Sequence, residues 1–190
     1  LGLINGGAAN IKANLESEAG YISAADAVKL GSAVTNACDE LDGVKDGLIN
    51  DPRACRIDIS TLPLTAAQLK TYQILHDGPK TSSGKPLYPG LPFGSEAAGW
   101  ATVLAGPSFA EAHTRAGRAV LTNGAWGSLV YHDPKWNFLM FDPDKSPADA
   151  ERAIGHIVGA PSPNLSSFKA RGGKLITVHG WADPLITPYG

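Results

Sequence analysis

The segment FKARGGKLITVHGWADP, residues 168–184, constrains the fold of this chain more than any other stretch. Its first four residues have the pattern of a helix end, and the Gly-Gly pair that follows stops the helix. The apolar run at 174–180 then predicts a short buried strand, and the polar WADP phrase turns the chain away from the strand end. A helix, a glycine stop, an apolar strand and a polar turn in this order are typical of an open parallel sheet in an α/β protein.

Asp183 lies in that turn, just beyond the carboxyl end of the predicted strand. Catalytic and ligand-binding groups of open α/β sheets gather at this edge, so Asp183 is a candidate functional residue. An isolated Asp-Pro pair is also a common turn former, and this second interpretation is favoured when the pair is considered alone.

Three segments combine helical spacing of apolar residues with a Ser or Thr that can cap a helix. They are residues 23–37 with Ser23 as N-cap, the segment from Thr65 to the Gly78-Pro79 stop, and 146–158 with Ser146 as N-cap and Pro147 at the first position. Residues 80–94 are rich in Gly, Pro and Ser and predict a long surface loop, and 95–141 is the least regular part.

The overall composition excludes two kinds of partner. The chain has 190 residues with 16 basic and 18 acidic side chains, a formal net charge of −2, so it lacks the basic surface of a duplex nucleic-acid binder. Its apolar runs are far shorter than the roughly 18 residues that a membrane span needs. We therefore expect neither a nucleic-acid nor a membrane partner.

The stretch CDELDGVKDG, 38–47, places four carboxylates and two glycines in ten residues. Carboxylates and backbone carbonyls are the ligands of Ca²⁺, and glycine allows a backbone to curl around an ion. The spacing does not follow the EF-hand pattern, and a solvated acidic turn explains the loop equally well. The candidate ligands are the side chains of Asp39, Asp42 and Asp46 and the carbonyls of Val44 and Leu48.

The only two cysteines, Cys38 and Cys55, bracket this acidic loop. If they are bridged, the closed loop of about 17 residues stabilises the fold by roughly 3 kcal/mol in the chain-entropy treatment. The alternative is a pair of buried free thiols. A bridge indicates an oxidising compartment, where calcium is also available, so the disulfide and the ion site support each other.

The sequence lacks the common motifs of nucleophilic and metal-dependent catalysis. There is no G-x-S-x-G phrase; the nearest match, GPSFA at 106–110, has a proline before Ser108 and no preceding strand, which argues against a nucleophile elbow. The five histidines, at positions 76, 113, 132, 156 and 179, are scattered, and we expect most of them on the surface or in satisfied core positions.

Two long phrases, CDELDGVKDGLINDPRAC (38–55) and FKARGGKLITVHGWADPLI (168–186), resemble the tannase and feruloyl esterase family. The members of that family are secreted serine esterases with an α/β-hydrolase core and a large inserted lid. The resemblance implies an α/β fold class, namely a segment of an α/β-hydrolase with a mixed lid domain. The lid would cover 1–166, with the calcium loop at 38–55, and 167–190 would hold a helix end, a core strand and the acid turn.

The resemblance also implies roles for single residues. It assigns a structural Ca²⁺ to Asp39, Asp42, Val44, Asp46 and Leu48, and a disulfide to Cys38 and Cys55. Asp183 would be the acid of a Ser-His-Asp triad, and His179 would line the substrate pocket. The aromatic segment 126–141, which begins with Trp126, would form a wall for a phenolic acyl group, or else simply be lid core.

The family's nucleophilic serine precedes the lid and its histidine follows the acid, and this chain contains neither phrase. We therefore expect a fragment of a secreted or periplasmic carboxylic-ester hydrolase that acts on feruloyl, galloyl or related aromatic esters. Its partner would be the rest of the same polypeptide, and alone it would be inactive. Two alternatives remain: a secreted, calcium-stabilised module that binds polysaccharide or phenolic ligands without catalysis, and a structural interaction domain.

Overall fold

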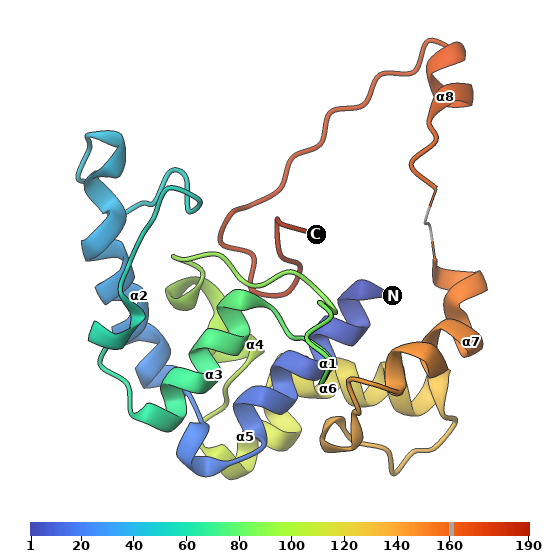
Figure 1. Ribbon diagram of the computed structural model, residues 1–190, viewed down its shortest axis with the longest axis horizontal. Coiled ribbons are helices and arrows are strands. Elements are labelled where there is room, and N and C mark those ends of the chain that lie inside the picture. Colours follow the sequence, from blue (N-terminus) through green and yellow to red (C-terminus); the bar gives the residue numbers. More distant parts are fainter. Residues whose placement is uncertain (160–161) are drawn as a thin grey trace.

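The computed structural model describes residues 1–159 and 162–190, and these residues form an assembly of helices joined by long loops (Figure 1). The α-helices are α1 (Gly2–Leu15), α2 (Ala24–Cys38), α3 (Ala66–Asp77), α4 (Ala101–Val103), α5 (Phe109–Arg115), α6 (Gly117–Ala125), α7 (Ser146–Val158) and α8 (Ser166–Ala170). Short 3₁₀ turns lie at η1 (Glu18–Gly20), η2 (Asp39–Asp42), η3 (Ile59–Thr61) and η6 (Phe138–Met140), and π turns at η4 (Glu96–Trp100) and η5 (Trp126–Val130). No helix in the described ranges is long and apolar enough to cross a membrane.

The predicted helices behind Ser23 and Thr65 are confirmed, because both begin with a reciprocal capping box. Ser23 accepts a hydrogen bond from the backbone of Asp26, whose carboxylate accepts the Ser23 N–H in return. Thr65 and Gln68 form the same pair at the start of α3, which ends at Asp77 with Gly78 as its C-cap. The helix at 146–158 is also confirmed, although its N-cap is Lys145 and not the predicted Ser146.

Helix α1 was not predicted, because its sequence is rich in glycine and asparagine, which are poor helix formers. The helix lies among α3, α5 and α6, and two adjacent glycines let its neighbours approach. A Cβ atom on Gly7 would lie 2.8 Å from the guanidinium of Arg118, and one on Gly6 would lie 2.5 Å from the ring of Tyr88. Tertiary packing therefore outweighs local propensity in this helix. The irregular segment 95–141 likewise contains α5 and α6.

The interior is divided into three clusters of buried side chains. One surrounds α2 and α3 and includes both cysteines, and a second lies between α1, α5 and α6. The third is centred on Trp126, whose ring stacks on Trp136 with 5.5 Å between ring centroids. Trp126 is fully buried there, as the core alternative for this aromatic segment requires.

The carboxyl-terminal segment differs from the buried strand that its sequence predicts. Helix α8 lies apart from the other helices, and after it the chain runs in an extended path back to them and ends beside them (Figure 1). Leu175, Ile176 and Val178 are 65%, 87% and 89% exposed. A buried strand needs neighbouring strands for its N–H and C=O groups and covers for both faces, and the described residues supply neither. The segment 1–166, for which the resemblance implies a mixed lid, is helical: its described residues form no strand beyond an isolated bridge between Lys80 and Pro86.

Candidate functional site

Asp183 is held by the backbone of its own turn. Its Oδ1 accepts hydrogen bonds from the N–H groups of Leu185 at 2.8 Å and Ile186 at 2.9 Å. The other oxygen, Oδ2, lies 3.8 Å from Nε2 of His179, and about a third of the Asp183 side chain is exposed. The turn therefore fixes one carboxylate oxygen and leaves the second available to an imidazole.

His179 is tied to the same turn, and the structure thus brings together two residues that were assigned separately. Its Nε2 lies 2.8 Å from the carbonyl oxygen of Ile186. The imidazole is also about one third exposed. His179 thus borders the carboxylate, in a position from which it can contact a bound molecule.

Contacts with the helical part of the chain anchor the turn that carries Asp183. Pro184 packs directly on Gly99 in η4, where a Cβ atom would collide with the proline ring. Thr187 is buried, and its hydroxyl donates to the carbonyl of Gly90 at 2.6 Å. Asp183 is therefore positioned by the helices, although the segment that leads to it is exposed.

The acidic loop is ordered by its own carboxylates. Asp39 is nearly buried and accepts the N–H groups of Asp46 at 3.2 Å and Gly47 at 3.0 Å. Asp42 and Asp46 each cap the residue two positions ahead, at 2.9 and 3.1 Å. Gly43 and Gly47 have φ values of 89° and 81°, the left-handed region that a curling loop requires.

The donor set of this loop fits a hard cation in its chemistry, since the three side chains offer only oxygen. The three carboxylates do not converge on one point: the described residues contain no group of three or more His, Cys, Asp or Glu side chains arranged to hold a metal. The carboxylates instead accept backbone N–H groups. Calcium at Asp39, Asp42, Val44, Asp46 and Leu48 therefore stays a prediction.

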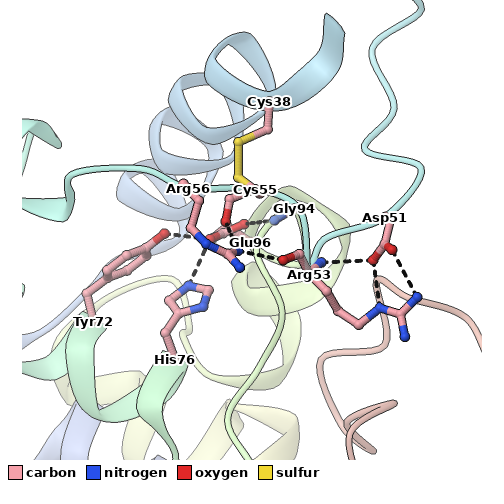
Figure 2. Close-up of a disulfide and its surroundings, with 9 residues drawn as sticks. All are labelled: Cys38, Asp51, Arg53, Cys55, Arg56, Tyr72, His76, Gly94 and Glu96. Atoms are coloured by element: carbon pink, nitrogen blue, oxygen red, sulfur yellow. Dashed lines mark hydrogen bonds and ion pairs between the residues drawn. A yellow bond between two sulfur atoms is a disulfide. The ribbon is translucent and has the colours of Figure 1, made fainter. Parts of the chain in front are cut away.

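The disulfide between Cys38 and Cys55 is confirmed (Figure 2). The two Cα atoms are 5.4 Å apart, and the bridge closes 17 residues of sequence. Both half-cystines are buried in the cluster around α2 and α3. The bridge thus fastens the acidic loop to the end of α2.

A cavity of about 580 Å³ lies between the acidic loop and the acid turn, and its lining includes Asp42, Asp46, Phe93 and Trp181. Arg53, at the end of the loop, places its guanidinium 5.1 Å from the centre of the Trp181 ring. The same guanidinium pairs with Asp51 at 2.8 Å, and this hydrogen-bonded pair lowers the pKa of Asp51 (Figure 2). The disulfide-closed loop and the turn that carries Asp183 thus line the same cavity.

Sequence reasoning missed a buried polar cluster beneath the disulfide (Figure 2). Glu96 is fully buried; its Oε1 accepts the Tyr72 hydroxyl at 2.6 Å and lies 2.9 Å from Nε2 of His76, while Oε2 accepts the Gly94 N–H at 2.8 Å. Burial opposes ionisation of Glu96, but the hydrogen bond and charge of His76 and the hydroxyl of Tyr72 outweigh it and lower the pKa. The cluster ties α3 to η4, and no motif in the sequence indicates it.

The other two residues that the sequence analysis considers are Trp126 and Ser108. The Trp126 indole donates to the carbonyl of Ile4 at 3.3 Å and borders a cavity of about 210 Å³ that Leu185 also lines. Ser108 caps α5 by accepting the N–H of Glu111. This capping role agrees with the expectation that Ser108 is not a nucleophile.

Comparisons with known proteins place these features in a family. Residues 5–190 match the family model described as tannase and feruloyl esterase. An uncharacterised esterase of Xanthomonas campestris pv. campestris is 33% identical over 94% of this chain and 34% of its own length. Feruloyl esterase B of Aspergillus niger is 30% identical over 98% of this chain and 36% of its own length.

The fold is that of part of a solved esterase. The crystal structure of feruloyl esterase B from Aspergillus oryzae superimposes with a TM-score of 0.82 at 24% identity, over 99% of this chain and 38% of that one. The chain thus spans about a third of the length of the relatives it matches. Because the family model covers nearly all of its residues, the chain belongs to the tannase and feruloyl esterase family.

Proposed function

We propose that this chain is the lid and acid-bearing part of a serine carboxylic-ester hydrolase that acts on feruloyl, galloyl or related aromatic esters. The observation that carries the proposal is the Asp183 carboxylate, with one oxygen bound to two backbone N–H groups and the other accessible. An acid that orients an imidazole needs this arrangement: a fixed carboxylate with one oxygen left to accept the ring N–H.

In the complete enzyme, a serine outside this chain attacks the ester carbonyl, and a histidine outside it takes the serine proton. Asp183 holds that imidazole in the required tautomer and stabilises the imidazolium that forms. The alcohol then leaves with the proton, and water hydrolyses the acyl-enzyme by the same steps. His179, beside the carboxylate, is the residue of this chain that we assign to the substrate side, whereas Trp126 is buried in the core.

The rest of the polypeptide is the proposed partner. The apolar segment 174–178 has the composition of a core strand and is exposed here. We infer that neighbouring strands of the same polypeptide bury this segment. In this proposal residues 1–166 are the lid and 167–190 are the acid-bearing unit. The disulfide supports a secreted or periplasmic location, and a structural Ca²⁺ in the loop 38–55 would add rigidity to the lid.

The test is Asp183→Asn in the full-length esterase. Loss of the acid's charge leaves the imidazole poorly oriented, so we expect kcat on methyl ferulate to fall by about 10³- to 10⁴-fold. Asp77→Asn, at an exposed position that ends α3, is the matched control and should keep full activity. Turnover by Asp183→Asn at the parent rate would exclude the triad role. Binding of phenolic ligands without any turnover by the full-length protein would instead support the non-catalytic module.

A further inference from the structure

Arg118 places a buried guanidinium against the acid turn. The residue is the second of α6 and is only 5% exposed. Its Nη2 donates to the carbonyl of Pro184 at 3.3 Å and also to the carbonyl of Leu185. These are the two residues that follow Asp183, and Leu185 also gives its N–H to the Asp183 carboxylate.

This guanidinium has no ion-pair partner within 4 Å among the described residues. Its Nε is buried without a hydrogen-bond partner there. Burial lowers the pKa of Arg118 to about 10, while nearby Tyr88 and Asp183 favour its charged form. A buried charge without a close counter-ion costs stability, so a purely structural role would be served better by an apolar side chain.

The packing around Arg118 leaves room for the guanidinium at this spot. Gly7 on α1 faces it, and a Cβ at that position would lie 2.8 Å from Nη1. Pro184 of the same turn also packs on Gly99. The acid turn is thereby held between a rigid contact with η4 and a charged hydrogen-bond donor from α6.

We propose that Arg118 is a positioning residue for Asp183: by binding the carbonyls of Pro184 and Leu185 it fixes the turn whose N–H groups orient the carboxylate. This inference rests on the proposed function, because it gives Arg118 a role only where Asp183 acts as the acid. Arg118 does not touch the reacting atoms; it sets the angle at which Asp183 Oδ2 meets the imidazole.

The experiment uses the full-length esterase and an activated aryl ester, whose hydrolysis stays measurable in weakened variants. A displacement of about 1 Å in a catalytic group costs up to about 100-fold, so Arg118→Met should lower kcat by about 10- to 100-fold. KM should change by less than about threefold, since substrate binding is not the property lost. Arg118→Lys keeps the charge and one donor, and should recover part of kcat. Arg115→Met, at an exposed arginine of α5, is the control and should keep the parent kcat.

The decisive measurement repeats Arg118→Met in the Asp183→Asn background. If Arg118 acts through Asp183, the substitution should cost little there, because the group that it positions no longer orients the imidazole. An equal fold-loss in both backgrounds, a change in KM alone, or an unchanged kcat would refute the positioning role. Full activity of Asp183→Asn itself would refute the proposed function, so the two failures are distinguishable.

Gly7→Ala supplies a second, independent perturbation if Arg118→Met does not fold. The added methyl group displaces the guanidinium tip without removing its charge. We expect a smaller fall in kcat than in Arg118→Met, and again no further fall in the Asp183→Asn background. Parent-level kcat in Gly7→Ala, with thermal unfolding unchanged, would count against the positioning role.

Discussion

Two carboxylates of this chain, Asp183 and Glu96, show how local surroundings assign different roles to similar groups. Asp183 is partly exposed and keeps one oxygen available, which suits contact with a residue from outside the chain. Glu96 is fully buried and has hydrogen bonds at both oxygens, which suits a structural role. Exposure and free hydrogen-bonding capacity therefore separate the candidate catalytic acid from the structural one.

Glu96→Gln should destabilise the protein at neutral pH. Glutamine keeps the shape but removes the charge that His76 and Tyr72 bind, so we expect a loss of about 2 to 4 kcal/mol in the free energy of unfolding. Denaturant unfolding at pH 7 measures this loss. Glu151→Gln, at an exposed glutamate of α7, should change the free energy little, and equal stability of Glu96→Gln and the parent would contradict the role of the cluster.

The same variant has a defined pH dependence. The pKa of Glu96 is lower in the folded state than its ordinary value of 4.5, so the stabilisation from its charge is complete above that value. It is lost as the pH falls below 4.5 and through the folded-state pKa. The difference in stability between parent and Glu96→Gln should therefore shrink as the pH falls below about 4.5.

At the scale of elements, the acidic loop and the acid turn depend on each other. The loop is closed by the disulfide, and its last residues reach Trp181 through Arg53. This contact joins the loop to the turn that carries Asp183. An ion in the loop would act on the site through this contact and not by touching substrate.

Calcium should accordingly raise the thermal stability of the full-length protein. Ligand binding to the native state alone stabilises by about 2.7 kcal/mol when the ligand is at 100 times its dissociation constant. We expect millimolar Ca²⁺ to raise the unfolding midpoint and a chelator to reverse the rise. Asp46→Asn should abolish the response, while Glu40→Gln, in the same loop but paired with Lys45, should keep it. A midpoint that is the same with calcium and with chelator would exclude the ion site.

Elements that are stabilised by neighbours in sequence could be predicted, and those that need distant contacts could not. The capping boxes at Ser23 and Thr65 are complete within four residues, so α2 and α3 could be predicted from the sequence. Helix α1 depends on partners more than seventy positions away, among them Arg118, and its own composition opposes a helix. The contacts of Arg118 with the acid turn likewise join residues 66 and 67 positions apart, beyond what spacing can reveal.

At the scale of the whole molecule, the exposure of the extended segment 174–178 bears on the proposal that this chain is part of a longer esterase. Its apolar side chains face solvent here, whereas the pattern predicts burial. Hydrogen exchange should therefore be fast at 174–178 in the isolated chain and strongly protected in the full-length esterase, where strands would pair with it. Amides of α2 and α3 serve as internal controls, because capping and packing protect them in both forms.

The same comparison predicts activity. The isolated chain should hydrolyse no methyl ferulate, since an orienting acid performs no acyl transfer without nucleophile and base, while the full-length protein should turn over. Turnover by the isolated chain would require a nucleophile that we have not identified among its residues. Fast exchange at 174–178 in both forms would show that the segment is not a core strand. Asp183 would then not lie at the edge of a sheet, and its assignment to an α/β-hydrolase core would be wrong.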